Sequence, residues 1–439
     1  MNDRTWVLIV GASLIVNLCW ALAVRPLDAP DEPAHLQAVR QVQLRRMLPE
    51  VHYSFARDPA GEIVRTPDDP ATRYYAMRRG VLDEYKLEPY ESMQPPLYYL
   101  VAGLAAMPVG QNPVWAMVTG RVVSACLGAS AVGCLWLAVR RLAPGSPALA
   151  LAAAGFVGLL PQFAFNSASV SNDSAVNFAS ALAVAVWIGA LRTPESDPRL
   201  LRSGAAVGLA LLAKLNAVAL VPGLLLLVLF QAWPGAEGLA RVGRIARLAA
   251  WTGAGLLAIS GWWFVRNFIV YDGDPTGSRD AIRFYQANFK PLNVWSRDDW
   301  ALLRAMSWES FWGRFGWLTI RLPDWRYVEA RLASVLLLVL SAWAILRRWR
   351  ALDGVQVRAG IILATVFATL LASYLQFNFS VAFQSQSRYL FPAILPLALA
   401  LTGGLATLPP TPNGRRWAVG LLLVWMASLN LSGLWKVGP

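Results

Sequence analysis

The sequence predicts an all-α, polytopic membrane protein of about eleven transmembrane helices. The chain has 439 residues, of which 56% are apolar and only 15% are charged. Its mean hydropathy is +0.44, which is far too apolar for a soluble protein of this length. Several apolar runs approach or exceed the roughly 20 residues that cross a bilayer as a helix. No regular apolar–polar alternation indicates a membrane barrel.

Hydropathy places the first span at about residues 5–24. This run is longer than the apolar core of a signal peptide, so we expect it to stay uncleaved. The piece 203–213 is short and ends at Lys214, which is typical of a half-helix. The complete set of expected spans is about 5–24, 114–138, 147–166, 172–191, 203–213, 215–233, 248–266, 330–347, 357–376, 388–407 and 416–434.

Arginine sets the expected orientation. The net charge is +13, but the arginines fall mainly between apolar runs, which indicates positive-inside anchoring rather than nucleic-acid binding. With the N-terminus in the cytoplasm, every short loop expected inside is rich in arginine. These inside arginines are Arg140, Arg141, Arg192, Arg199, Arg202, Arg241, Arg244, Arg247, Arg347, Arg348, Arg350, Arg415 and Arg416.

The same orientation predicts two large external loops, at 25–113 and 267–329. Residues 95–109, "PPLYYLVAGLAAMPV", are too short for a span, so we expect an interfacial or re-entrant helix. Counting this piece as a span would put Arg140 and Arg141 outside. We therefore expect 1–439 to form one transmembrane domain, with juxtamembrane helices in 25–113 and no soluble C-terminal domain.

The stretch "APDEPAHL" follows the first span and carries Asp31 and Glu32. An amphipathic surface helix is expected behind it, over 33–47, with Pro33 at its first position and with Leu36, Val39, Leu44 and Met47 roughly on its apolar face. The two acids have two explanations. They suit a helix N-terminus, one of them as the cap, or they form a reactive site at the external face of the membrane.

Other polar residues lie at span ends that the topology places on the same side as Asp31. Ionisable groups at membrane depth are functional candidates, although snorkelling or helix capping also explains each one. Three cations near one bilayer face suit a lipid phosphate. The residues in question are Asn172, Asp173, Lys214, Arg266, Asn267, Arg388 and Tyr389.

No metal site is assigned from the sequence. The chain has two histidines, His35 and His52, and its cysteines lie inside apolar runs as small core residues. The segment Asp272-Gly-Asp274 resembles a metal-binding DxD, but Gly-Asp-Pro is also typical of a turn. No cofactor is required by these patterns, and a divalent cation stays an open alternative.

Taken in order, the motifs resemble those of the GT-C glycosyltransferases that use polyprenyl-phosphate sugars. "APDEPAHLQAV" is similar to the first-loop motif of protein O-mannosyltransferases and aminoarabinose transferases, and "QPPLYYL" to their Pro-Pro-Leu-Tyr-Tyr motif. "GRVVSACLGA", "SVSNDSAV", "LLAKLNAVALVPGLL", "WWFVRNFIVYDGDPTG" and "SRYLFPAILPLALAL" also look like this superfamily. The set most resembles a bacterial family of predicted membrane proteins within it.

The resemblance implies inverting transfer of a sugar from a polyprenyl-phosphate donor to an acceptor hydroxyl at the external face of the bacterial inner membrane. The acceptor would be a glycan, a lipid or a protein. Asp31 would be the general base, and Glu32 would orient the acceptor or the loop. The expected binding residues are Lys214, Arg266 and Arg388 as a phosphate clamp, Asp173 tuning a cation, His35 supporting Asp31, and Gln94, Tyr98, Asn267 and Tyr389 within the motifs.

One departure concerns Gln94, because related transferases often carry Lys or His before the two prolines. Two rival functions remain open. A transporter or flippase of lipid-linked sugars would also need cations, but it favours inverted repeats and ionisable groups spread through the midplane. A non-catalytic subunit of an envelope-glycan complex would leave Asp31 dispensable.

Overall fold

The structure is a computed structural model that describes residues 5–49, 90–193, 196–234 and 237–438. Helices make up nearly all of the described chain, which confirms the all-α prediction. Within this part, the one sheet is a ribbon of β1 (Arg314–Phe315) and β2 (Ile320–Arg321), antiparallel with Arg314 opposite Arg321. Residues 50–89 of the predicted loop 25–113 lie outside the described residues.

Nine helical segments of the described chain are long and apolar enough to cross a membrane. The predicted count of about eleven stays a prediction, because α6 (Pro147–Gly158) and α9 (Asp197–Ala213) are shorter. The nine are α1 (Thr5–Ala23), α5 (Pro113–Leu142), α8 (Asp173–Leu191), η3 (Leu215–Leu220) with α10 (Val221–Ala232), α11 (Gly238–Val270), α14 (Asp324–Arg348) with η4 (Trp349–Ala351), α15 (Gly354–Ser380), η5 (Ser387–Ala393) with α16 (Ile394–Thr407), and α17 (Pro412–Val437).

Two expected spans are broken by local chemistry. The run 147–166 divides into α6 and α7 (Pro161–Asn166), because Pro161 has no amide hydrogen to continue the ladder of α6. The chain also breaks at Lys214, where the backbone is extended with φ −162° and ψ 142°. This break agrees with the predicted end of a half-helix, although α9 begins earlier than expected, at Asp197.

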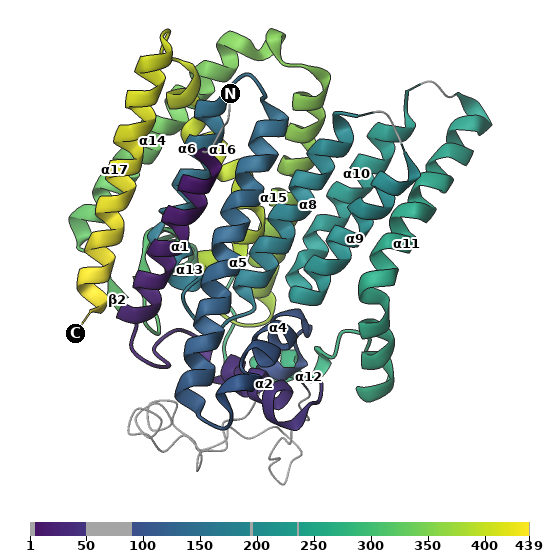
Figure 1. Ribbon diagram of the computed structural model, residues 1–439, viewed down its shortest axis with the longest axis vertical. Helices are drawn as coiled ribbons and strands as arrows, with labels where there is room; N and C mark the ends of the chain where they lie inside the picture. The colour runs from purple at the N-terminus through teal and green to yellow at the C-terminus, as the bar shows by residue number, and fades with distance from the viewer. Residues whose placement is uncertain (1–4, 50–89, 194–195, 235–236, 439) are drawn as a thin grey trace.

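The helices form a bundle with α17 and α14 at one edge and α11 at the other (Figure 1). Helix α5 lies between them and packs on α1, α6 and α8. Helices α9 and α11 approach closely through two glycines. A Cβ on Gly204 would lie 1.8 Å from the Thr252 carbonyl oxygen, and one on Gly255 would lie 2.0 Å from the Leu201 carbonyl oxygen. Small residues allow such backbone contact between membrane helices.

One end of the bundle carries α2 (Glu32–Arg45), α4 (Leu97–Ala105) and α12 (Arg279–Asn288) (Figure 1). At 1.5 Å per residue, α4 is about 14 Å long, well short of a ~30 Å bilayer core. This length agrees with the interfacial helix expected in 95–109. The same end holds η1 (Tyr90–Met93), η2 (Met107–Val109) and α13 (Arg297–Trp312), which belong to the two loops expected to be external.

Helix α2 packs its buried face on α4. Leu36 and Val39 are buried as expected, and Gln43 donates to the carbonyl oxygens of Ala106 at 2.7 Å and Gly110 at 2.6 Å. Leu44 and Met47, expected on the same face, are exposed, and Met47 lies beyond the end of α2, so contact of this face with the bilayer stays a prediction. Packing on α4 buries a face that contains a polar glutamine, since carbonyls at the ends of α4 and η2 accept hydrogen bonds from it.

Candidate active site

Asp31 has an unusual backbone for an aspartate at a helix start. Its φ is 64° and its ψ is −1°, in the left-handed region, and its side chain makes no capping bond to α2. The carboxylate Oδ2 instead lies 2.5 Å from Nη2 of Arg388. Helix capping therefore does not account for this side chain, because a simple cap would bond to the helix amides.

Arg388 belongs to an ion network built from distant parts of the chain. Its Nη1 lies 3.5 Å from Oδ2 of Asp173, at the start of α8. Oδ1 of Asp173 lies 2.6 Å from Nζ of Lys214, at the break between α9 and η3. The network thus alternates acid and base in the order Asp31, Arg388, Asp173, Lys214, and it joins four elements at one end of the bundle.

Exposure distinguishes Asp31 from the other three. Its side chain is 24% exposed, whereas those of Arg388, Asp173 and Lys214 are 5%, 3% and 12% exposed. Buried charges of this kind are costly unless they are paired, and a break in one pair leaves its partner unsatisfied. The two cations of the network, Arg388 and Lys214, are therefore largely shielded from solvent, whereas the Asp31 carboxylate lies at the solvent-accessible edge of the network.

Tyr389 forms one wall of this site. Its ring centroid lies 5.1 Å from Cζ of Arg388 and 5.4 Å from Nζ of Lys214, within the range of cation–π attraction. Its hydroxyl donates to Oε1 of Gln384 at 3.0 Å and accepts from Nη2 of Arg388 at 3.3 Å. Tyr389 therefore fixes the positions of both cations.

Glu32 has a different environment from its neighbour Asp31. It is fully buried, and Arg121 on α5 grips its carboxylate through Nε at 2.8 Å and Nη2 at 2.7 Å. The Val170 amide donates to the same carboxylate at 3.0 Å. Glu32 thus ties the start of α2 to α5 and to the segment before α8, so it holds the loop that carries Asp31.

Arg121 also binds the end of α1. Its Nη1 donates to the carbonyl oxygens of Ala21 at 2.9 Å and Val24 at 2.7 Å, and Nη2 donates to that of Arg25 at 3.0 Å. These carbonyls have no intrahelical partners, because the helix has ended. One arginine therefore satisfies both a helix C-terminus and a buried acid.

His35 supports α4 through a pair with Tyr99. Its Nδ1 lies 2.9 Å from the Tyr99 hydroxyl, which in turn reaches the Glu91 carbonyl oxygen at 3.3 Å. Burial lowers the pKa of His35 to about 3, so the ring is neutral at physiological pH. A neutral, buried imidazole paired with Tyr99 is a positioning group for α4, and its expected support of Asp31 stays a prediction.

Glu91 is a further carboxylate that we did not single out in the sequence. It is buried, and its Oε2 has no hydrogen-bond partner. Burial, and then the charge of Asp31, raise the pKa of Glu91 to about 7. The sequence contains a signal for Glu91, because this acid lies three residues before Gln94, the first residue of the segment that resembles a transferase motif. Arg121 was similarly visible only as the charged residue of an apolar run.

Two expected binding residues lie outside the ion network. The Tyr98 hydroxyl donates to the Gly120 carbonyl oxygen at 3.1 Å and lies 2.8 Å from Oγ of Ser124, so it fastens α4 to α5. The side chain is fully buried. Gln94 precedes α4, and its Oε1 is buried without a hydrogen-bond partner. The network does not include either residue.

Arg266 and Asn267 lie near the end of α11. The Arg266 guanidinium lies 4.8 Å from the Trp263 ring and 6.0 Å from the Tyr271 ring, and Nη1 donates to Oδ1 of Asn267 at 3.1 Å. These contacts hold Arg266 against its own helix. The structure therefore joins Lys214 and Arg388 of the expected clamp, and it leaves Arg266 on a separate element.

The segment Asp272-Gly-Asp274 forms a turn. Asp272 and Gly273 have φ of 49° and 82°, and the Asp274 carboxylate accepts bonds from the Thr276 and Arg279 amides. Across the described residues, no group of three or more His, Cys, Asp or Glu side chains is arranged to hold a metal ion.

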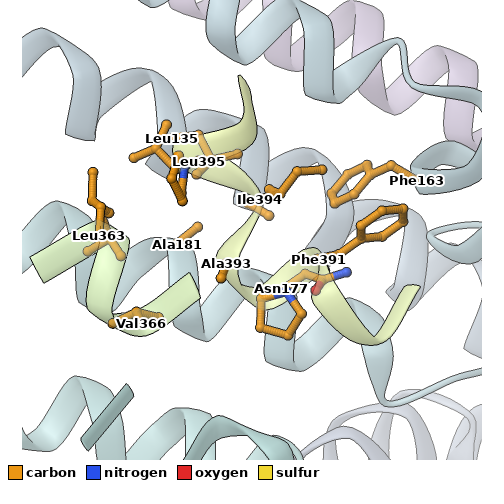
Figure 2. A pocket seen from close by; sticks show the side chains of 14 residues that line it. Leu135, Phe163, Asn177, Ala181, Leu363, Val366, Phe391, Ala393, Ile394 and Leu395 are labelled. Carbon is orange, nitrogen blue, oxygen red and sulfur yellow. The ribbon is translucent and has the colours of Figure 1, made fainter. Parts of the chain in front are cut away.

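A small apolar hollow lies inside the bundle, between α5, α8, α15 and η5. Figure 2 shows Asn177 close to Phe391 there, with Phe163 and Leu395 further along. Its volume of about 10 Å³ is near the space that one water molecule occupies. Both amide atoms of Asn177 lack a protein partner. The hollow is therefore too small for a sugar or a lipid chain.

Solved structures resemble the whole described fold. ArnT from Cupriavidus metallidurans in the apo state superposes with a TM-score of 0.54 at 19% identity, covering 97% of this chain and 63% of that one. The Archaeoglobus fulgidus oligosaccharyltransferase in its apo form gives 0.53 at 11% identity, covering 100% and 57%. This chain is therefore a polytopic membrane protein whose fold is similar to that of these two proteins.

The chain belongs to the DUF2142 family of predicted membrane proteins, whose model matches residues 89–397. No curated protein matches its sequence. A further similar structure is AglB from Archaeoglobus fulgidus in complex with an inhibitory peptide and a dolichol-phosphate, with a TM-score of 0.52 at 11% identity, covering 100% of this chain and 57% of that one. The chain spans less than two thirds of the length of each of these proteins.

Proposed function

We propose that this protein is a glycosyltransferase that moves a sugar from a polyprenyl-phosphate donor to an acceptor hydroxyl. The observation that carries the proposal is the partly exposed Asp31 carboxylate at the edge of a buried network with Arg388 and Lys214. The GT-C type of fold supports it. So does the dolichol-phosphate bound to the similar AglB structure, because that ligand is a lipid phosphate.

The proposed reaction is a single displacement. The acceptor oxygen attacks the anomeric carbon on the face opposite the phosphate, and a new C–O bond forms as the bond from that carbon to the phosphate oxygen breaks. The phosphate leaves with the electron pair, and Asp31 takes the acceptor's proton as general base. The configuration at the anomeric carbon inverts. Arg388 and Lys214 offset the negative charge that grows on the leaving phosphate.

The ion pair between Asp31 and Arg388 implies that the donor binds before Asp31 takes the proton of the acceptor. A carboxylate held 2.5 Å from a guanidinium is a weakened base, because the cation favours the ionised form. A donor phosphate competes for the same guanidinium, which binds phosphate strongly. Donor binding therefore releases Asp31 for the acceptor, while Glu32 and Arg121 keep the loop in place. We expect this site at the extracytoplasmic face of the inner membrane.

The proposal is tested by the change Asp31→Asn in a strain that lacks the chromosomal gene. Deletion should cause one polyprenyl-linked sugar to accumulate, and Asp31→Asn should leave that accumulation unrelieved. Loss of a general base slows such a reaction by about 10²–10⁴-fold. Mass spectrometry of the lipid-linked sugars, at matched levels of membrane protein, provides the measurement.

Asp272→Asn is a matched control, because Asp272 also has a positive φ, of 49°, and is exposed. Asparagine tolerates this backbone region, so neither change strains the chain. The control should restore the normal lipid pool. A normal pool in the Asp31→Asn strain would remove Asp31 as the base. A deletion strain with no lipid-linked sugar accumulated would count against the transferase itself.

A further inference from the structure

A hollow lined by charged residues lies at the ends of α5 and α8, and these helix ends are at the opposite end of the bundle from α2 and α4 (Figure 1). It is formed where α5 and α8 end and α9 begins, and its volume is about 380 Å³. Half of its lining residues are arginines. The lining consists of Arg141, Val186, Gly189, Ala190, Arg192, Thr193, Arg199 and Arg202.

The inner arginines are held rigidly by the helix ends. Nη1 of Arg141 donates to the Ala185 carbonyl oxygen at 2.7 Å, and Arg192 donates through Nε to the Arg141 carbonyl oxygen at 2.8 Å and through Nη2 to that of Leu142 at 2.6 Å. Gly189 permits this arrangement, because a Cβ there would lie only 3.0 Å from Nη1 of Arg141. The guanidinium groups are therefore fixed before any ligand arrives.

Two of the four lining arginines have polar partners of their own: Arg192 pairs with Asp353, and Arg199 also makes a polar or electrostatic interaction. Arg192 pairs with Asp353 at 2.8 Å, and both side chains of that pair are solvent-accessible. Nearby Asp197 lies 3.5 Å from Arg247, which is outside the lining. Arg202 is exposed at the rim. Positive-inside anchoring explains why arginines lie in this loop. It does not require that they line one hollow with their guanidinium groups held in place.

We propose that this arginine hollow binds the phosphodiester headgroup of an anionic phospholipid. Arginines bind phosphate through paired, charge-assisted bonds, and basic pockets between membrane helices take anionic headgroups. Val186 and Ala190 of α8 give the lining an apolar part beside the arginines, which suits the glycerol and the first acyl carbons. A free phosphate ion would gain nothing from that apolar part. This proposal does not rest on the transferase reaction.

The test uses the purified full-length protein in detergent, with dioleoylphosphatidylglycerol as the probe and dioleoylphosphatidylcholine as the neutral comparison. Native mass spectrometry counts the bound lipid. The change Arg199→Gln with Arg202→Gln should weaken binding of the anionic lipid by roughly fivefold for each arginine removed. The double change Arg347→Gln with Arg416→Gln removes equal charge from exposed positions outside the lining and should keep normal binding.

Equal retention of the anionic lipid by wild type, variant and control would overturn the proposal, as would equal retention of the neutral lipid. Displacement of the lipid by millimolar inorganic phosphate would assign the hollow to a soluble phosphate instead. If the double variant does not fold, Arg202→Gln alone is used, because this side chain is exposed. Gly189→Ala is a second check: it keeps every charge but displaces Arg141, so it should also weaken binding.

Discussion

Asp31 and Glu91 are both acids near the same cations, yet their environments separate their proton affinities. Asp31 is partly exposed and paired with Arg388 at 2.5 Å, which favours its ionised form. Glu91 is buried with an unpaired Oε2, and burial raises its pKa to about 7. Carboxylates whose environments differ in this way suit different tasks. We therefore assign proton transfer to Asp31 alone and expect Glu91 to set the pH response of the site.

Glu91→Gln should flatten the dependence of stability on pH. The raised pKa means that the folded state binds the proton more tightly than the unfolded state, so stability is greatest at low pH. It should fall as the pH rises from about 4.5 to about 7, by an amount of the order of 3 kcal/mol. Thermal unfolding of the purified protein between pH 5 and pH 8 measures this fall.

Glu237→Gln is the comparison for that series, because Glu237 is exposed and the change removes the same charge. It should keep the wild-type slope of melting temperature against pH. A Glu91→Gln protein with an unchanged slope would show that another group causes the pH response.

At the scale of elements, one buried salt bridge sets the position of the whole α2 segment. Glu32 and Arg121 lie 89 residues apart in sequence and connect the end of α1, the start of α2 and the middle of α5. Arg121 makes its remaining bonds to carbonyls of the α1 end. Removal of the acid would leave the buried guanidinium without its ion-pair partner, with backbone carbonyls and the charge of Asp28 among its remaining favourable interactions, and the loss of one partner of a buried ion pair is costly.

Glu32→Gln should therefore destabilise the protein by about 3–5 kcal/mol. Unfolding of the purified protein by heat or by sodium dodecyl sulfate measures the loss. Asp280→Asn provides the contrast, since Asp280 and Arg283 form an exposed pair at 3.4 Å, and exposed pairs contribute about 0–1 kcal/mol. Similar losses in both variants would mean that Glu32 does not act as the anchor described here.

Most helices were predictable because each one displays its hydrophobicity within a single window of sequence. The break at Lys214 was also visible locally. The contacts among the site residues were not predictable from the sequence. Asp31 and Arg388 are 357 residues apart, and their contact depends on how the helices pack. The burial of Gln43 on α2 was not predictable for the same reason, because it depends on carbonyls at the ends of α4 and η2 that accept its hydrogen bonds.

At the scale of the whole molecule, the two ends of the bundle carry different kinds of charge. One end holds the mixed network of Asp31, Arg388, Asp173 and Lys214, with acids and bases in alternation. The opposite end holds arginines at the ends of α5, α8 and α14, several of them exposed. Positive charge collects on the cytoplasmic side of membrane proteins. We therefore predict that the ion network faces away from the cytoplasm.

Cysteine labelling tests this orientation. Lys290→Cys lies in the exposed chain between α12 and α13, at the network end, and Arg416→Cys lies at the exposed start of α17, at the arginine end. Both are made in a background in which Cys19, Cys126 and Cys134 are replaced by alanine. In cells whose inner membrane is intact, a membrane-impermeant maleimide should label Lys290→Cys and spare Arg416→Cys.

Disruption of the inner membrane should then make Arg416→Cys reactive. This control shows whether the intact membrane had protected the thiol or whether the thiol is unreactive in itself. The cysteine-free parent controls for background labelling. The reverse pattern, with Arg416→Cys labelled in intact cells, would place Asp31 on the cytoplasmic side. Such a result would rule out an extracytoplasmic transferase while leaving the ion network itself unchanged, because the contacts among Asp31, Arg388, Asp173 and Lys214 do not depend on the direction of insertion.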